Sequence, residues 1–216
     1  MAATRTRRKR KVSIEIRALE PEDAEAVAEL FSSPSVVGGT LRLPHRSRAE
    51  LAEWLRAGPA ELHALVAVVD GRVMALGSVH LQSNPRTRHS AEVGLVVHES
   101  AQGRGIGGRL LDALLELGVD WLAVLRFSLC VFVDNKAAIK LYRSRGFDIE
   151  GVGRGFALRG GELVDVFHMV KLAETLPWPR VTAEEVAQRT PPQLSSGPDT
   201  SGNGGGKGKK NSKLWN

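Results

Sequence analysis

The sequence contains one cysteine and one tyrosine among its 216 residues, and aromatic residues make up only 5% of it. A single cysteine, Cys130, cannot form a disulfide bond within the chain, so a disulfide-stapled fold is excluded. Because it lies in the apolar run 127–133, we expect a buried, inert thiol. No apolar run approaches the roughly 20 residues that a membrane-spanning helix requires. The basic N-terminal residues are not followed by the apolar stretch of a secretory signal, so we predict a cytoplasmic protein with no membrane partner.

Positive charge is concentrated at the two ends of the chain. Of the net charge of +6, residues 1–11 contribute +6 and residues 173–216 contribute +2, which leaves −2 for residues 12–172. A slightly acidic central region lacks the basic surface that a phosphate backbone requires, so we expect no specific nucleic-acid partner. The Gly-, Ser-, Pro- and Lys-rich C-terminal end cannot bury enough apolar surface to fold. We predict one domain over 12–172 between a basic disordered tail and a low-complexity, mostly disordered tail.

Strand-like and helix-like patterns alternate within this domain, which predicts a mixed α/β fold. Asp70-Gly71 is a two-residue hairpin signal and predicts antiparallel pairing of its neighbours. Ser47 is the predicted N-cap of the second helix. The predicted strands are 14–17, 62–69, 72–82, 91–97, 127–133 and 163–170, and the predicted helices are 21–31, 47–56, 105–122 and 135–145.

A glycine-rich turn lies between a predicted strand and a predicted helix. Several backbone N–H groups can converge on one anion at the start of a helix, and glycines let a ligand approach without a Cβ in the way. The turn predicts a phosphate-binding cradle, while a tight turn without a ligand remains an open alternative. Its residues are Gln102, Gly103, Arg104, Gly105, Ile106, Gly107 and Gly108.

The glycines at 103, 105 and 108 also match the spacing of a dinucleotide-binding motif. In that fold the first glycine directly follows the first strand of a parallel unit. Here residues 98–102 intervene and an antiparallel hairpin precedes, so the context argues against a dinucleotide site.

A second motif runs from Asn135 to Phe147, a predicted helix with an Asn cap at its start and Gly146 at its end. Asn135 and Tyr142 are separated by seven residues, close to two helical turns, so an amide and a phenol can lie along one face. A capped helix whose Tyr142 packs into the core would explain the same residues.

Together the two motifs resemble the GNAT superfamily of N-acetyltransferases, which carry Gln/Arg-x-x-Gly-x-Gly/Ala and then Asn-x-x-Ala-x-x-x-Tyr-x-x-x-Gly-Phe. Gln102–Gly107 and Asn135–Phe147 match these patterns. The resemblance implies a central, mostly antiparallel sheet flanked by helices, acetyl-CoA as co-substrate and no metal. Scattered residues, among them Thr40-Leu41 and Pro44-His45, are similar to bacterial acetyltransferases that act on the α-amine of free amino acids such as phenylalanine and methionine.

The resemblance further implies direct attack of the amine on acetyl-CoA in a ternary complex, with no role for Cys130. The backbone N–H groups of residues 103–108 would hold the pyrophosphate, and Asn135 would orient the pantetheine or the thiol. Tyr142 is the candidate general acid for the departing thiolate. The backbone groups expected to pair with the pantetheine arm, in the manner of an added strand, are those of Leu95, Val96 and Val97.

Glu92 lies on the strand before the turn, where several related enzymes place an acidic base. We predict that it accepts the amine proton directly or through water, and a plain surface carboxylate is the alternative. His80 and His168 are alternative bases, although a lone strand histidine is more often structural.

Residues 32–46 are predicted to form a loop that walls the acceptor site, because loops beside a rigid scaffold often carry specificity. A plain connecting loop explains the sequence equally well. The residues expected to contact the acceptor are Thr40, Leu41, Leu43 and Pro44.

The predicted reaction is acetylation of a primary amine of a small molecule, most specifically a free amino acid. Protein N-termini, polyamines and antibiotic-like amines are alternative acceptors. A CoA-binding sensor without catalytic activity is an alternative of a different class. Because many relatives form dimers, we also expect a homodimer.

Overall fold

The computed structural model describes residues 13–45, 47–57 and 61–173. Seven strands form one sheet in the order β1-β2-β3-β4-β5-β7-β6, and all neighbours are antiparallel except the parallel pair β4 and β5. This confirms the predicted mixed α/β fold with a mostly antiparallel sheet. The strands are β1 (Ile14–Ala18), β2 (Leu62–Val69), β3 (Arg72–Leu81), β4 (Ser90–Val97), β5 (Arg126–Phe132), β6 (Asp148–Arg159) and β7 (Glu162–Leu172).

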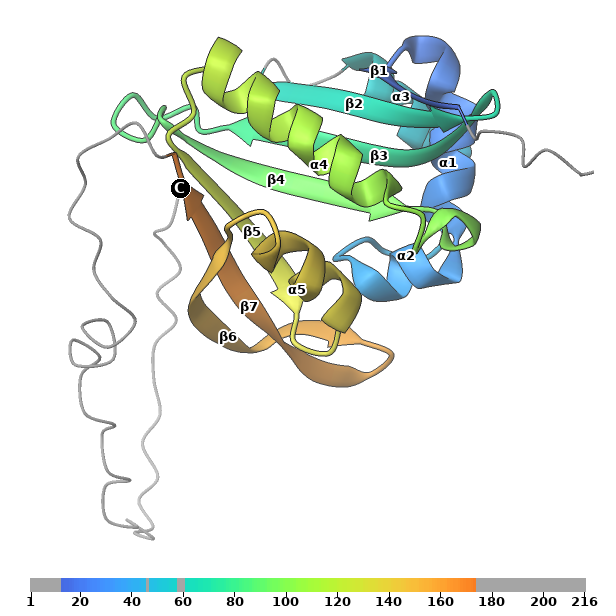
Figure 1. Ribbon diagram of the computed structural model, residues 1–216. Helices are drawn as coiled ribbons and strands as arrows, with labels where there is room; N and C mark the ends of the chain where they lie inside the picture. The colour runs from blue at the N-terminus through green and yellow to red at the C-terminus, as the bar shows by residue number, and fades with distance from the viewer. Residues whose placement is uncertain (1–12, 46, 58–60, 174–216) are drawn as a thin grey trace, which may run out of the picture. The chain divides into compact units, whose positions relative to one another are not determined.

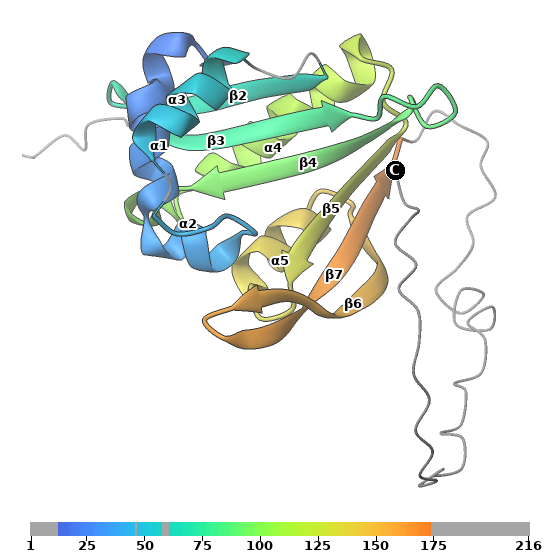
Figure 2. The same cartoon turned by 180° about the vertical axis from the view of Figure 1, so that it is seen from behind.

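Helices lie on both faces of the sheet (Figures 1 and 2). A 3-10 turn, η1 (Pro21–Asp23), leads into the helices of one face, α1 (Ala24–Ser32), α2 (Pro34–Gly39) and α3 (Arg48–Ala57). The opposite face carries α4 (Ile106–Glu116) and α5 (Lys136–Arg143). We call these the α1 face and the α4 face.

The alternation of side chains along each strand separates two hydrophobic cores. In β4, Ala91 and Val93 are buried in the core beneath α4, whereas Val96 packs into the core beneath α1. Glu92 is exposed. Because alternate residues of a strand share a face, Glu92 lies on the same face as Gly94 and Val96, which is the α1 face. The strand thus contributes apolar packing to one side and a carboxylate to the other.

Local signals in the sequence produce the predicted turns and caps. Asp70 and Gly71 adopt φ of 49° and 84° between β2 and β3. The Ser47 hydroxyl accepts a hydrogen bond from the Ala49 N–H at 3.2 Å, as expected for an N-cap. Both predictions are confirmed.

The predicted helix 105–122 is too long. Regular α4 ends at Glu116 and continues as a π-helical turn, η3 (Leu117–Trp121). Gly118 lies directly against the Phe127 ring, and a Cβ there would be 2.5 Å from a ring carbon. We attribute the change of helix type to this close approach to β5.

Two elements were not predicted. Helix α2 lies within the segment predicted as a loop, so that prediction is wrong for residues 34–39. Strand β6 was missed because glycines at 151, 153 and 155 interrupt its pattern, and it joins β7 through Gly160-Gly161.

The prediction of a buried Cys130 is also wrong, since its side chain is exposed. Phe127, Leu129 and Val131 point into the core beneath α4, so Cys130 points to the α1 face. An apolar run does not reveal which of its two faces is covered.

The predicted tails lie outside the described residues, except for Ala173. None of the helices in the described part of the chain is both long and apolar enough to span a membrane.

Candidate active site

Strands β4 and β5 pair over only three positions, from Ser90 opposite Arg126 to Glu92 opposite Ser128. Beyond these positions β4 remains paired with β3, and β5 with β7, while the two strands diverge (Figure 1). One edge of β4 at residues 93–97 therefore has no partner strand within the described sheet. The predicted pantetheine-binding residues Leu95, Val96 and Val97 lie on this edge, where an extended ligand can add as a strand.

The glycine-rich turn connects this edge to α4. Gln102 donates a side-chain hydrogen bond to the Val97 carbonyl at 3.1 Å, which ties the turn to the end of β4. Gly103 and Gly105 have φ of 70° and 78°, in the left-handed region that favours glycine. The first N–H groups of α4 have no partner within the helix, and N–H groups at a helix start can bind an anion.

The other residues of the turn have distinct environments. Arg104 is exposed, whereas the Ile106 side chain is buried, so only the backbone of Ile106 can face a ligand. A Cβ at Gly107 would lie 3.2 Å from Val97, and one at Gly108 would lie 2.4 Å from the Arg145 guanidinium. Close packing against apolar side chains therefore accounts for Gly107, whereas Gly108 meets only the end of the flexible Arg145 side chain.

The second motif lies beside the first. The Asn135 side-chain oxygen accepts the Ala138 N–H at 3.1 Å and caps α5, as predicted. Leu141 of α5 contacts Gly107, since a Cβ there would be 3.4 Å away. The sheet and α5 thus bring both motifs to the α4 face.

Tyr142 is packed in the core and its ring lies edge-on to Phe147, with centroids 5.6 Å apart. Burial raises the pKa of the Tyr142 phenol to about 12. The packed-ring interpretation is therefore true of the ring, and the phenol keeps its proton at neutral pH.

Glu92 lies on the α1 face between His80 of β3 and Ser128 of β5. Burial and, secondly, the negative charge of Glu92 raise the pKa of the Cys130 thiol. Glu92 and Cys130 are therefore neighbours beside the point where β4 and β5 diverge.

Sequence reasoning did not anticipate a small cluster on this face. The Cys130 Sγ lies 3.1 Å from His168 Nδ1, and the His168 ring is edge-on to Phe156 with centroids 5.4 Å apart. His168 is thus held by two side chains, which favours the structural role over the role of a base. The register of β5 against β7 places Cys130 opposite His168, and the pairing of β6 with β7 adds Phe156.

The structure places the predicted acceptor residues in different environments. The Thr40 hydroxyl donates to the Val36 carbonyl at 2.8 Å and accepts the Arg42 N–H at 3.3 Å, so it closes the end of α2. Leu41 is 60% exposed and does not line the cavity that Leu43 and Pro44 share. Leu43 and Pro44 do line a common cavity.

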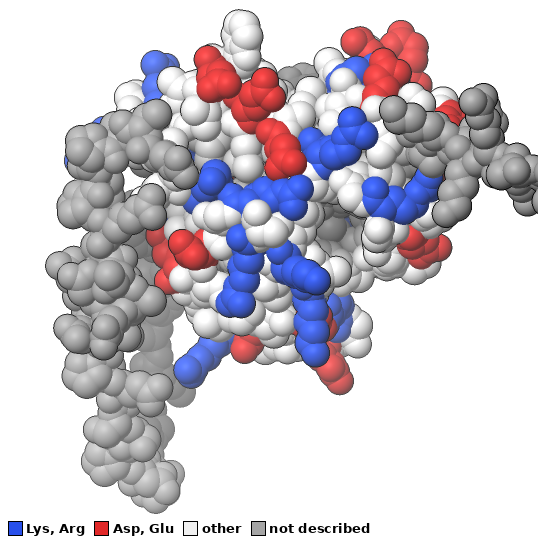
Figure 3. Space-filling view, in the orientation of Figure 1, with Lys and Arg blue, Asp and Glu red and all other residues white. Residues whose placement is uncertain are grey.

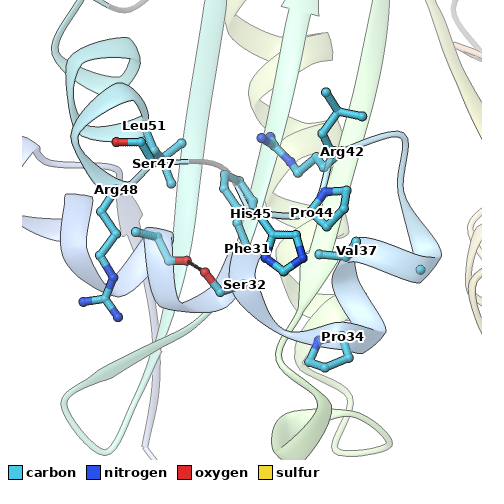
Figure 4. Close-up of a pocket in the computed structure, with 13 residues that line it drawn as sticks. Phe31, Ser32, Pro34, Val37, Arg42, Pro44, His45, Ser47, Arg48 and Leu51 are labelled. Carbon is cyan, nitrogen blue, oxygen red and sulfur yellow. Dashed lines mark hydrogen bonds between the residues drawn. The ribbon is translucent and has the colours of Figure 1, made fainter.

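That cavity, of about 470 Å³, lies between α1, α2 and the start of α3 (Figure 4). Phe31 forms part of its wall and carries the Arg42 guanidinium 3.5 Å from its ring centroid. Arg48 and His45 also face it, and no acidic residue is among its described lining residues. Neither Glu92 nor Tyr142 lines this cavity.

Basic side chains gather over α5 on the α4 face (Figure 3). Lys136, Lys140 and Arg143 of this helix are all exposed. This surface adjoins the glycine-rich turn and suits an anionic ligand.

Within the described residues there is no group of three or more His, Cys, Asp or Glu side chains that could hold a metal ion.

Comparison with known proteins gives a consistent picture. The sequence profile of the acetyltransferase (GNAT) family matches residues 24–147. The chain is 39% identical to the L-amino acid N-acetyltransferase AaaT of Escherichia coli K12, over 74% of this chain and 98% of that protein. It is 27% identical to spermidine N(1)-acetyltransferase of the same strain, over 64% and 75% of the two chains. The Salmonella typhimurium protein yncA, solved with its cofactor acetyl-CoA, superposes with a TM-score of 0.68 at 21% identity, over 79% and 99% of the chains.

Proposed function

The chain belongs to the acetyltransferase (GNAT) family and is an acetyl-CoA-dependent N-acetyltransferase, and we propose that its acceptor is the α-amine of a free amino acid. The observation that carries the proposal is the 39% identity to an L-amino acid N-acetyltransferase over nearly that protein's whole length. The cavity beside α2 supports it, because its apolar side chains and Arg42 suit an apolar carboxylate better than a polycation. Arg48, at the edge of the cavity, is paired with Glu25 at 3.3 Å.

The described residues fit acetyl-CoA, which supplies the thioester that the acceptor amine attacks. We assign the pyrophosphate to the backbone N–H groups of residues 103–108, where two glycines hold the required conformation. The unpaired edge of β4 at 95–97 would hold the pantetheine arm, and one of its N–H groups would polarise the thioester carbonyl. Asn135 uses its oxygen to cap α5, so its amide nitrogen would orient the pantetheine or the thiol.

Positioning of the two reactants accounts for most of the proposed rate acceleration. Tyr142 would donate a hydrogen bond to the departing thiolate from the α4 face. Glu92 would accept the amine proton from the α1 face, directly or through water. Acid and base thus work from opposite faces of the sheet, where β4 and β5 diverge.

We expect Glu92→Gln to lower kcat/KM for an amino acid at pH 7 by about tenfold or less, below the 10²- to 10⁴-fold typical of an essential base. The reason is that an α-amine loses its proton more readily than a lysine side chain, whose pKa is about 10.4. The defect should shrink as pH rises, because more of the amine is then neutral without assistance. The measurement is kcat/KM against pH, with His80→Gln, which removes the alternative base directly opposite in β3, compared under the same conditions. A loss above 10²-fold that persists at high pH would instead make Glu92 indispensable.

The proposed acceptor is tested by a thiol-release assay with acetyl-CoA and a panel of amines. Phenylalanine and methionine should give higher kcat/KM than spermidine or a short peptide. Phenylalaninamide, in which a neutral carboxamide replaces the carboxylate, should be poorer than phenylalanine by about tenfold, the worth of one charge-assisted hydrogen bond. Preference for spermidine or for the peptide would refute the amino-acid proposal, and tight CoA binding without turnover of any acceptor would favour a sensor.

A further inference from the structure

Arg159 connects three parts of the molecule that are far apart in the sequence. It is the last residue of β6, just before the Gly160-Gly161 turn. Its guanidinium donates to both carboxylate oxygens of Asp134 and, at 3.3 Å, to the Gly38 carbonyl of α2. It also lies over the Phe132 ring, 4.7 Å from the centroid. The side chain therefore links the β6–β7 hairpin to the end of β5 and to α2.

Both hydrogen-bonding partners of Arg159 adjoin the proposed cofactor site. Asp134 directly precedes Asn135, the cap of α5. Gly39, the last residue of α2, faces the same Asn135, since a Cβ there would lie 3.6 Å from Asn135 Nδ2. Helix α2 thus reaches the cofactor side of the molecule, and Arg159 fastens it there.

The shape of the β6–β7 hairpin places the Arg159 side chain close to α2. The register of β6 against β7 shifts between Gly153 and Ala157. Within the shift, the Gly155 N–H donates to Asp165 Oδ1 at 2.7 Å, and Gly155 has a φ of 53°. Such bulges bend a strand and re-aim its side chains. The end of the hairpin can therefore reach Gly38, which is 121 positions away in the sequence.

We propose that Arg159 is a positioning residue that holds α2 against the cofactor site, so that the acceptor wall and the acetyl-CoA site are assembled together. This inference rests on the acceptor side proposed above. A six-residue helix is too short to be stable by itself, so the placement of α2 depends on its tertiary contacts. Arginine suits the task because two nitrogens of its planar fork engage both oxygens of one carboxylate while one of them also reaches a carbonyl, and the single nitrogen of lysine cannot reproduce this geometry.

The test is Arg159→Lys, which keeps the charge and removes the fork. We expect the KM for phenylalanine to rise about tenfold, the equivalent of one charge-assisted hydrogen bond, while the Kd of CoA is unchanged. Backbone hydrogen exchange at residues 35–39 should accelerate in the CoA-bound protein. Asp134→Asn, which weakens the same contact from its other side, should reproduce both effects.

The chain offers a matched control in the ion pair of Arg126 and Glu150, which also joins β5 to β6. The two arginines are 30% and 33% exposed, and their carboxylate partners are 50% and 57% exposed. Arg126 lies at the opposite end of β5 from Phe132. Because exposed pairs contribute little to stability, Arg126→Lys and Arg159→Lys should unfold within about 2 °C of each other. Only Arg159→Lys should change the acceptor KM.

An unchanged acceptor KM and unchanged exchange at 35–39 in Arg159→Lys would overturn the inference. Equal effects in Arg126→Lys would also overturn it, because they would reflect a general loosening of the hairpin. If the wild-type protein acetylates no amino acid, the proposed acceptor is wrong, and hydrogen exchange still decides whether Arg159 holds α2.

Discussion

Tyr142→Phe is expected to lower kcat for acetyl transfer by about 10²- to 10³-fold, the range for loss of one hydrogen-bond donor to a developing negative charge. The substitution deletes one hydroxyl and keeps the ring that packs against Phe147. The Kd of acetyl-CoA and the midpoint of thermal unfolding should therefore change little. Steady-state kinetics and calorimetry on the same preparation separate these effects.

The environment of Tyr142 specifies how the phenol acts. With a pKa raised to about 12, complete proton transfer to a thiolate whose conjugate acid has a pKa near 8.5 is unfavourable by about 5 kcal/mol. The phenol therefore stabilises the developing thiolate mainly as a hydrogen-bond donor in a site shielded from water. Because a raised pKa keeps the phenol neutral, any loss of activity from its ionisation should occur above pH 10.

The pKa can be measured directly because Tyr142 is the one tyrosine of the chain. The ultraviolet absorbance of tyrosinate should titrate with a midpoint of about 12 in the folded protein, against 10.0 for an exposed tyrosine. Ser144→Ala is the matched control for kinetics, because it removes an exposed hydroxyl from the end of the same helix. Wild-type kcat in Tyr142→Phe would leave packing as the sole role of the ring.

The double variant Gly103→Ala/Gly105→Ala should raise the Kd and the KM of acetyl-CoA by about 30-fold, with kcat at saturation nearly unchanged. A left-handed φ costs an alanine about 1–2 kcal/mol per residue. In the protein without acetyl-CoA, the turn will therefore relax away from the conformation in which its N–H groups point toward one anion. Binding must then restore that conformation. A Cβ at either position meets no atom within 4 Å in the protein, so the loss comes from the backbone and not from a clash.

Gly71→Ala/Gly161→Ala provides the matched control for the turn. These glycines have φ of 84° and 89° and also have no atom within 4 Å of a Cβ. They lie in the β2–β3 and β6–β7 turns, so this variant should lose comparable stability to denaturant and keep its affinity for acetyl-CoA. Isothermal titration distinguishes the two cases. Equal affinity in both double variants would argue against the cradle.

The features that the sequence predicted correctly depend on short stretches of chain. The Asp70-Gly71 turn, the Ser47 cap and the Asn135 cap each require only the residues within one helical turn or hairpin loop. The two motifs of the site are local in the same sense. Their roles towards acetyl-CoA remain predictions.

The features that the sequence did not predict depend on which strands pair and which faces are covered. Cys130 lies in an apolar run, yet the face it occupies is not covered, so its thiol is exposed beside His168. Strand β6 carries too many glycines to show an apolar period, and its pairing with β7 defines it as a strand.

By itself, then, the sequence determined the family, the glycine-rich turn before α4 and the helix that carries Asn135 and Tyr142. These follow from backbone preferences and hydrogen bonds between near neighbours. Only the tertiary structure decided that β4 and β5 diverge after three pairs, and that Arg159 reaches both Asp134 and Gly38. Contacts of this kind depend on strand register and on packing between distant segments, which no local stretch of sequence specifies.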